Sequence, residues 1–209
     1  MSIRIIVADD RDLIRAGLRE FVRATDLEVV AEGTVSDAAR LVTQHDAAQL
    51  LILGLEPPGT DGLALVEQMK ASRAKPPAVL IYAARTSAEL IAKAIAVGTS
   101  GLLLHDANHE TFLQSIHSVV LGESLWSRED LRRAGSVGRL TDAGADVQLT
   151  RRESEVIVKM VEGLTNKQIA QHLEISYETV KEHVQHILRK LGVTDRTQAA
   201  VWAVRHGLA

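Results

Sequence analysis

The first 121 residues alternate short apolar runs with amphipathic stretches. The apolar runs predict strands, which we place at 3–8, 27–31, 50–55, 78–82 and 101–104. The amphipathic stretches predict helices at 12–24, 36–44, 62–72, 87–97 and 108–121. In the first of these, apolar residues recur at three- and four-residue intervals, as one buried face requires: Leu13, Ile14, Leu18, Phe21 and Val22. The alternation of strand and helix predicts an α/β domain with a five-stranded, doubly wound parallel sheet.

The carboxyl ends of these predicted strands carry the polar residues of the domain. Ligand chemistry in open parallel sheets lies at that edge, near the point where the strand order reverses. Asp9 and Asp10 follow the first strand, 54–61 follows the third, Tyr82 ends the fourth and His105 follows the fifth. We therefore expect any site of this domain to be built there.

Residues 122–148 lose this rhythm and form a polar stretch interrupted by glycines. Such a composition is typical of a linker, here with a short helix at 128–133. Trp126 is expected to pack against a domain. The sequence thus predicts a first domain at 1–121, a linker at 122–148 and a second domain at 149–209.

The second domain is predicted to be all-α, with helices at 151–162, 166–173, 177–191 and 198–206. The first two begin with capping boxes, in which a hydroxyl and a carboxylate or amide satisfy free amides: Thr150 with Glu153, and Thr165 with Gln168. Only 174–176 separate the second and third helices. Two short helices on a tight turn are typical of a helix-turn-helix.

The predicted helix 177–191 has an apolar face and a polar face. Its apolar residues are Val180, Val184, Ile187, Leu188 and Leu191. A recognition helix places its N-terminal half in the major groove, which directs Lys181, Glu182 and Gln185 at base edges. The start of the preceding helix suits a phosphate. The full set of predicted DNA contacts is Thr165, Asn166, Lys167, Ser176, Thr179, Lys181, Glu182, Gln185, Arg189 and Lys190.

The spacing alone also fits the ordinary solvated faces of a small helical bundle. Glu182 supports that alternative, because phosphates repel a carboxylate that finds no cytosine. His183 lies at the edge of the apolar face, where packing is the expected role. His183 and His186 have a spacing that metal sites use, but no acidic or Cys partner accompanies them, so we predict no metal there.

Composition limits the remaining classes of protein. The chain has 209 residues, of which 46% are hydrophobic and 24% charged, and it has no cysteine. Disulfides and thiolate metal sites are therefore excluded, and a cytoplasmic protein without a signal peptide or membrane span is expected. The net charge of −3 is unevenly placed, with nine basic against seven acidic residues from 149 onward and 15 against 20 before it. This asymmetry favours two domains with different partners.

The last 61 residues resemble the LuxR-type helix-turn-helix. The matching segments are 149–156, 163–170, 175–183, 190–193 and 196–199. The resemblance implies that Lys181 reads DNA and that the final helix, at 198–206, helps to pair two copies. Two-fold pairing would imply double-stranded DNA with an inverted-repeat site, its half-sites about one helical turn apart.

Residues 1–121 resemble the receiver domain of NarL/FixJ-type response regulators, which has a flavodoxin/CheY-like fold. The matching segments are 5–10, 58–62 and 96–102. The resemblance implies an aspartate at the end of the third strand that accepts a phosphoryl group. It also implies Mg²⁺ on that carboxylate and on the acidic pair, a Ser or Thr after the fourth strand and a Lys after the fifth.

This sequence departs from that pattern at every position except the acidic pair. The acceptor position is Gly54, and a one-residue shift would place Leu53 or Leu55 there. Tyr82 replaces the small hydroxyl residue and His105 replaces the Lys. We expect aspartyl phosphorylation to be lost.

The acidic pair itself allows two interpretations. Asp9 and Asp10 either keep a weak Mg²⁺ site, with Glu56 as a substitute third carboxylate, or serve as a loop end and a helix cap. We favour the second interpretation, because the third carboxylate is missing, and predict no cofactor.

The sequence predicts a homodimeric transcription regulator that binds DNA without aspartyl phosphorylation. A protein or small molecule acting on the receiver would supply its input. The alternative is a receiver-like interaction module that sequesters another regulator and binds DNA weakly, which the net charge and Glu182 keep open. An enzyme is the least expected class, because no nucleophile with a base and no phosphate-binding glycine loop is present.

Overall fold

The computed structural model describes residues 2–56, 61–72, 76–137, 147, 149–206 and 208. The chain forms two compact units, one made of Met1–Leu90 with Thr99–Leu125 and the other of Ile91–Gly98 with Trp126–Ala209. Part of the predicted motif at 58–62 (Pro58, Gly59 and Thr60) and most of the predicted linker after residue 137 lie outside the described residues.

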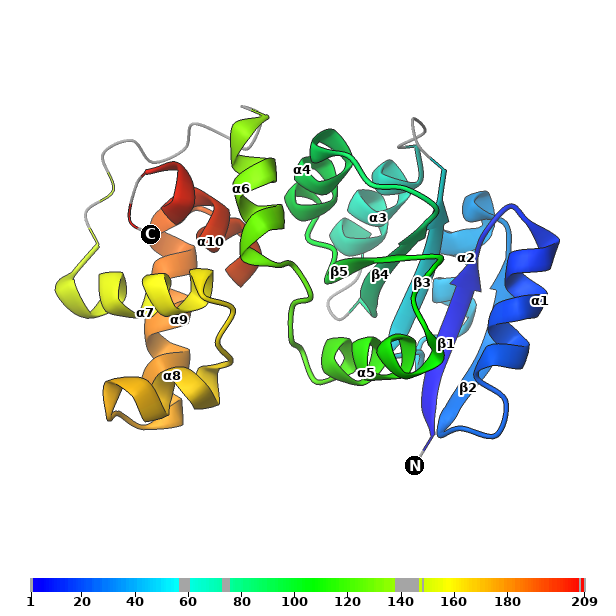
Figure 1. Cartoon of the computed structure of the whole chain (residues 1–209), viewed down its shortest axis with the longest axis horizontal. Coiled ribbons are helices and arrows are strands. Elements are labelled where there is room, and N and C mark those ends of the chain that lie inside the picture. Colours follow the sequence, from blue (N-terminus) through cyan, green and yellow to red (C-terminus); the bar gives the residue numbers. More distant parts are fainter. Residues whose placement is uncertain are drawn as a thin grey trace. The chain divides into compact units, whose positions relative to one another are not determined.

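The first unit contains the predicted five-stranded parallel sheet (Figure 1). Its strands are β1 (Ile3–Ala8), β2 (Leu27–Gly33), β3 (Leu50–Leu55), β4 (Ala78–Ala83) and β5 (Gly101–Leu104), in the order β2-β1-β3-β4-β5. β2 is two residues longer than predicted, because Glu32 and Gly33 pair with Val7 and Ala8 of β1. The strand order reverses between β1 and β3, which confirms the predicted doubly wound class.

The helices of this part of the chain are α1 (Asp12–Phe21), α2 (Ala38–Gln44), α3 (Asp61–Ser72), α4 (Ala88–Ala96) and α5 (His109–Val120); of α4, Ile91–Ala96 belong to the second unit. α1 ends three residues earlier than predicted, because Val22 is its C-cap and Ala24 takes a left-handed φ of 62°. A short 3₁₀ helix, η1 (Val35–Asp37), precedes α2 where the sequence predicted one continuous helix. Thr34 and Asp37 form a capping box there, which closes a tight turn before α2 begins.

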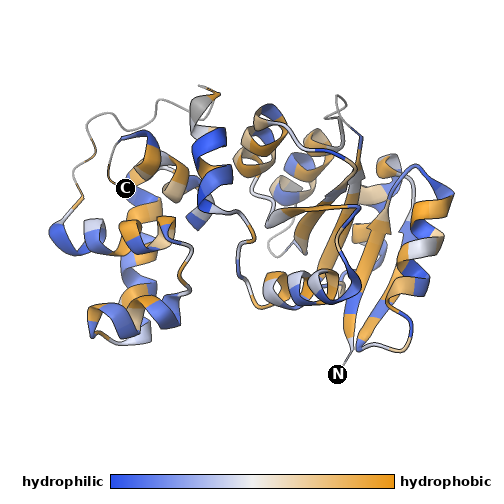
Figure 2. Cartoon of the chain, viewed as in Figure 1, coloured by the Kyte–Doolittle hydropathy of each residue, from blue (hydrophilic) through white to orange (hydrophobic). Residues whose placement is uncertain are grey.

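Alternate strand residues build the core of the first unit. Ile5, Val7 and Ile52 pack with α1 and α5 in one apolar cluster, which also includes Phe112. All residues of β3 are buried, as a central strand covered on both faces requires. Figure 2 shows the strands as the most hydrophobic elements of this unit.

Leu13 corrects the predicted buried face of α1. Leu18 and Val22 are buried, whereas the Leu13 side chain is 82% exposed. Leu13 precedes Leu18 by five residues, which places it about 140° around the helix from Leu18. Leu13 therefore lies on the solvent side, although its spacing to Ile14 and Phe21 appeared compatible with one buried face.

The second unit is helical, with α6 (Arg128–Ser136), α7 (Arg151–Val161), α8 (Asn166–Leu173), α9 (Tyr177–Leu191) and α10 (Arg196–Arg205). Its core contains Val156, Ile157, Ile169, Val180, Ile187 and Val201. α6 extends the short helix predicted at 128–133 and packs against α10. α10 begins two residues earlier than predicted, because the Asp195 carboxylate accepts hydrogen bonds from the amides of Thr197 and Gln198.

A membrane span was not expected, and none of the described helices combines the length and apolar character that crossing a bilayer requires.

Candidate functional site

The joint between α8 and α9 is a tight turn with its own hydrogen bonds. Glu174, the C-cap of α8, takes a left-handed conformation (φ 53°) that ends the helix. The Ile175 amide then donates to the Ala170 carbonyl at 3.1 Å. Ser176 begins α9, where its Oγ accepts from the Thr179 amide at 3.0 Å. The turn thus fixes the start of α9 relative to α8, as a helix-turn-helix requires.

α9 separates its apolar and polar residues cleanly. Val180, Ile187 and Leu191 are buried, and α7, α8 and α10 contact the helix. Lys181 and Gln185 are exposed on the side away from that core. The structure therefore anchors the apolar face and leaves the predicted reading face open within this unit. The exposed predicted contacts of α9 are Ser176, Lys181, Glu182, Gln185, Arg189 and Lys190.

The Lys181 ammonium has one anionic neighbour on its own helix. Its Nζ lies 3.8 Å from Glu178 Oε2, and both side chains are more than half exposed. An exposed pair of this kind contributes at most about 1 kcal/mol. Lys181 can therefore leave Glu178 for a nucleic acid at little cost.

The hydroxyls at the helix starts already serve as caps. Thr165 Oγ1 accepts from the Gln168 amide at 3.3 Å, and Ser176 Oγ lies 2.8 Å from Thr179 Oγ1. Asn166 is half-buried and Lys167 is exposed beside Thr165. Among the predicted phosphate contacts at the start of α8, Lys167 is thus the exposed residue.

Lys190 is tied down by an ion pair that sequence reasoning missed. Its Nζ donates to Glu153 Oε2 at 2.6 Å, and the Glu153 side chain is only 4% exposed. The same oxygen accepts from the Thr150 amide at 2.7 Å. Burial opposes ionisation of Glu153, but the hydrogen bonds from Lys190 and Thr150 lower its pKa overall. The pair fastens the end of α9 to the start of α7, so we rank Lys190 below Arg189 as a phosphate contact.

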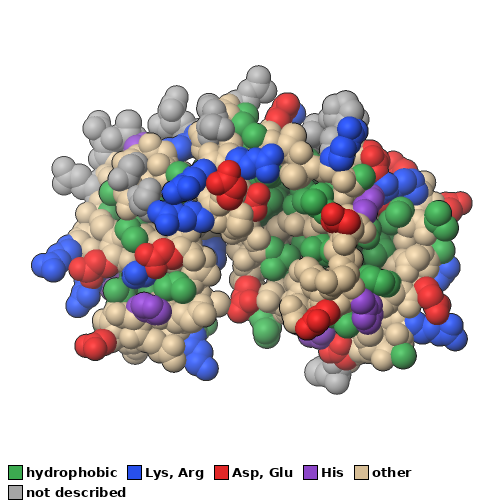
Figure 3. Space-filling model, in the orientation of Figure 1, with side chains coloured by type: hydrophobic (Ala, Val, Ile, Leu, Met, Phe, Trp, Pro, Cys, Tyr) green, Lys and Arg blue, Asp and Glu red, His purple; other side chains and the backbone are tan. Residues whose placement is uncertain are grey.

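Charge on the surface is mixed. On the face shown in Figure 3, basic and acidic side chains are interspersed over both units. This agrees with the small net charge of −3.

At the carboxyl edge of the sheet, the Asp9 carboxylate lies over Gly54. Asp9 follows β1, and its side chain is 3% exposed. A Cβ on Gly54 would collide with the Asp9 carboxylate. The space in which a side chain at position 54 would begin is therefore filled by a neighbouring acid.

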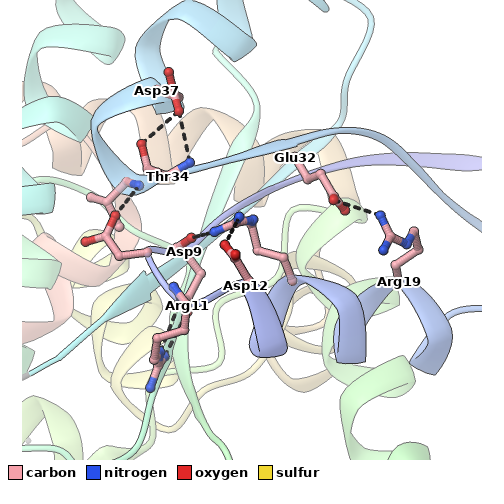
Figure 4. A network of polar contacts seen from close by, with 10 residues as sticks. Asp9, Arg11, Asp12, Arg19, Glu32, Thr34 and Asp37 are labelled. Carbon is pink, nitrogen blue, oxygen red and sulfur yellow. Dashed lines mark hydrogen bonds and ion pairs between the residues drawn. The ribbon is translucent and has the colours of Figure 1, made fainter.

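Arg11 binds that acid through its guanidinium (Figure 4). Its Nε donates to Asp9 Oδ1 at 2.9 Å and its Nη2 to Asp9 Oδ2 at 2.8 Å, a two-point contact. Arg11 Nη1 also forms an ion pair with Glu56, and the Arg15 guanidinium donates to the Asp9 carbonyl at 2.5 Å. The hydrogen bond to Asp9 raises the pKa of Arg11 further above its ordinary value.

Tyr82 and His105 complete the pocket. Tyr82 pairs with Gly54 in the register of β3 and β4, and its ring lies 4.4 Å from the His105 ring, centroid to centroid. Burial raises the pKa of the Tyr82 hydroxyl. Burial and the nearby Arg11 charge lower the pKa of His105. The structure thus places Asp9, Gly54, Tyr82 and His105 near one another at this edge of the sheet, and their role as a degenerate receiver pocket stays a prediction.

The comparisons with known proteins agree with both units. A family model described as response regulator receiver domain matches residues 5–117, and one described as bacterial regulatory proteins, luxR family, matches residues 147–203. The chain is 32% identical over 213 residues to the transcriptional regulatory protein LiaR of Bacillus subtilis (strain 168), with 99% of each chain covered. It is 29% identical over 202 residues to the nitrate/nitrite response regulator protein NarL of Escherichia coli (strain K12), with 95% of this chain and 93% of NarL covered.

A solved structure agrees over the whole length. The response regulator ChrA of a heme-sensing two-component system is 30% identical, with a TM-score of 0.50, 100% of this chain covered and 99% of ChrA. This chain is a NarL-type response regulator. It has a receiver domain followed by a LuxR-type helix-turn-helix, and it belongs to a family of DNA-binding transcription regulators.

In this response regulator the second acidic residue has a hydrogen-bond partner of its own. Asp10 Oδ1 accepts a hydrogen bond from the Val35 amide at 2.9 Å, at the start of η1. Asp9 is held by Arg11, so the two carboxylates do not converge. Among the described residues, no three His, Cys, Asp or Glu side chains are arranged to hold a metal ion. A Mg²⁺ ion needs several oxygen ligands at about 2.0–2.1 Å, and the receiver residues present do not fit it.

Sequence reasoning missed Arg11, the residue that organises this pocket. A single arginine after an acidic pair looks like an exposed loop residue, and its partner Glu56 is 45 positions away. The available signal was the surplus of acids at one sheet edge, which requires a cation from some source.

Proposed function

We propose that this response regulator binds DNA through α9 as a pair of copies and acts without aspartyl phosphorylation. The observation that carries the proposal is the overlap between the Asp9 carboxylate and the side-chain position of Gly54, alongside a reading face on α9 that is open within its unit. We place the receiver function at 1–121 and the DNA-binding function at 149–209, joined by 122–148.

The proposed DNA contacts divide by role. Lys181, Glu182 and Gln185 face base edges, since they lie in the N-terminal half of α9. Lys167 and Arg189 contact phosphates, because both are exposed cations beyond the ends of that stretch. Asn166 and the capping hydroxyls of Thr165, Ser176 and Thr179 lie where the backbone of a nucleic acid would pass. Lys190 stays with Glu153.

Two copies would read an inverted repeat with half-sites about one helical turn apart. The resemblance assigns the pairing to the last helix, but α10 buries its apolar side within its own unit. The buried residues are Ala199, Ala200, Val201, Trp202 and Ala203. We therefore propose a homodimer on DNA without assigning its interface to that side of α10.

Loss of phosphorylation follows from position 54 and its surroundings. Glycine offers no oxygen to phosphorylate, and Tyr82 and His105 take the places of the small hydroxyl and the lysine. The fold persists because burial of aliphatic residues stabilises the sheet, independently of the pocket. A protein or small molecule acting on the receiver then supplies the input. Since the proposed ligand is DNA, the proposal places the chain in the cytoplasm.

DNA binding is tested by selecting bound duplexes from a random pool and titrating the winner at several salt concentrations. Groove binding predicts a preferred sequence and a logarithmic salt slope of several units. Binding that is weak, flat and indifferent to sequence would instead favour the sequestering module, which the exposed Glu178 and Glu182 beside Lys181 keep as the second candidate.

Phosphorylation is tested separately by incubation with acetyl phosphate and Mg²⁺, followed by intact mass. We expect no addition of about 80 Da. A stoichiometric adduct would refute phosphorylation independence and leave the DNA-binding part of the proposal intact.

A further inference from the structure

We infer that the Arg11 guanidinium is the resident cation of the receiver pocket and takes the place that a divalent metal has in other receivers. The inference deepens the proposed phosphorylation-independent function and rests on it for its regulatory meaning. Its structural basis is the Arg11 cluster, which we define as Arg11, Asp9, Glu56 and His105.

The first argument is charge balance. Asp9 is a carboxylate with only 3% of its side chain exposed, and such a group requires a cation and hydrogen bonds. Arg11 supplies both, with two N–H groups on the two Asp9 oxygens at 2.9 and 2.8 Å. Its third nitrogen pairs with Glu56. One guanidinium therefore pairs with two acids at the edge of the sheet.

The second argument is space. The Asp9 carboxylate lies over Gly54, and both of its oxygens already accept hydrogen bonds from Arg11. Asp10 is engaged with the Val35 amide. A metal would have to displace a two-point, charge-assisted contact at Asp9, which is among the stronger polar contacts in proteins.

The third argument concerns the residue that replaces the family lysine. Arg11 Nη2 lies 3.3 Å from His105 Nε2. A guanidinium has no acceptor and stays protonated, so His105 Nε2 must accept and the imidazole is neutral. The positive charge of the pocket has thus moved from the end of β5 to residue 11. A single side chain thus supplies the positive charge that the metal and the lysine supply in the usual receiver.

The consequence is a receiver site whose cation is a side chain of the chain itself. Divalent metal is not required to complete it, and a change in metal concentration does not alter it. The inference therefore excludes a divalent metal as the input of this receiver.

The test titrates the full chain with Mn²⁺ as the probe. The concentration of free Mn²⁺ is measured by electron paramagnetic resonance. Wild type is expected to bind no Mn²⁺ at up to about 1 mM. Arg11→Ala should release Asp9 and Glu56 and bind Mn²⁺ at least about tenfold more tightly than wild type. Arg11→Lys keeps a cation beside Asp9 and should remain without bound metal.

Arg19→Ala is the matched control, because Arg19 lies on α1, pairs with Glu32 and carries the same charge. It should behave as wild type. Stoichiometric Mn²⁺ binding by wild type would overturn the inference, even if Arg11→Ala fails to fold. A folded Arg11→Ala chain that binds no more Mn²⁺ than wild type would also overturn it. Neither result changes the acetyl phosphate or DNA measurements, so failure of this inference is distinguishable from failure of the proposed function.

Discussion

The Asp9 carboxylate occupies the space into which a side chain at Gly54 would extend. The two residues lie at the ends of neighbouring strands, since β1 pairs with β3 directly. Because glycine has no side chain, space remains beside it, and the Asp9 carboxylate, which Arg11 binds, fills that space. Replacing the glycine therefore does not simply restore an acceptor.

Gly54→Ala is expected to destabilise the chain by about 1–3 kcal/mol, because the new methyl group overpacks against Asp9. Gly54→Asp should cost at least as much, because it adds a second carboxylate to the first. Urea unfolding measures both. Gly17→Ala is the control: Gly17 lies in α1 with nothing near its Cβ position, and the change should be neutral or stabilising. A Gly54→Asp chain as stable as wild type would show that Asp9 readily moves aside.

Lys181→Ala is expected to weaken specific DNA binding by about 1–3 kcal/mol and non-specific binding by less. The reason is that Lys181 faces base edges in the proposed function and gives up only an exposed contact with Glu178. Fluorescence anisotropy on the selected duplex and on a scrambled one measures the difference. Lys159→Ala removes the same charge from α7, where Lys159 pairs with Glu162, and should change neither. Equal losses of affinity for both duplexes would show that Lys181 contacts phosphate and not base edges.

Lys190→Met should destabilise the chain by about 1–2 kcal/mol at pH 7, because it leaves the buried Glu153 carboxylate without its cation. The comparison is Lys159→Met, which leaves the exposed Glu162 without its cation. It should lower the free energy of unfolding by less than about 1 kcal/mol. Chemical unfolding at pH 7 measures both variants, and equal costs would contradict the structural role of Lys190.

The cost of Lys190→Met should also depend on pH. The folded-state pKa of Glu153 is lowered from its ordinary 4.5, so the pair stabilises above that value and loses its effect as the pH falls through the folded pKa. Repeating the unfolding series toward pH 3 should shrink the difference between wild type and variant. A difference that grows on acidification would contradict this assignment.

His105 and His117 should titrate on opposite sides of the ordinary histidine pKa of 6.5. Burial and Arg11 lower the pKa of His105, whereas the hydrogen bond with Asp26 raises that of His117. Two-dimensional NMR of the imidazole protons measures both in one sample. Asp26→Asn should bring His117 back toward 6.5 and leave His105 unchanged. The raised pKa means that the His117 contact stabilises at low pH and that this contribution is lost as the pH rises through the folded value.

The sequence by itself determined the elements and their classes. Hydrophobic periodicity is a local property, so it correctly predicted the five strands, the helix-turn-helix and the apolar side of α9. Gly54 could also be located from sequence, because it falls in the predicted strand at 50–55 and the resemblance to a receiver domain implies the acceptor position there. Even the errors, such as Leu13, arose where residues five apart were assigned to one face.

Tertiary structure decided the ionic contacts. Arg11 meets Glu56 across 45 positions, and Lys190 meets Glu153 across 37. Periodicity carries no information about which charged side chains become neighbours at such separations. That depends on which strand ends meet at one edge of the sheet and on how the helices cross. The predicted loss of the acceptor therefore came from the sequence, whereas Arg11 could be placed beside Asp9 and Glu56 only once β1 and β3 lay side by side.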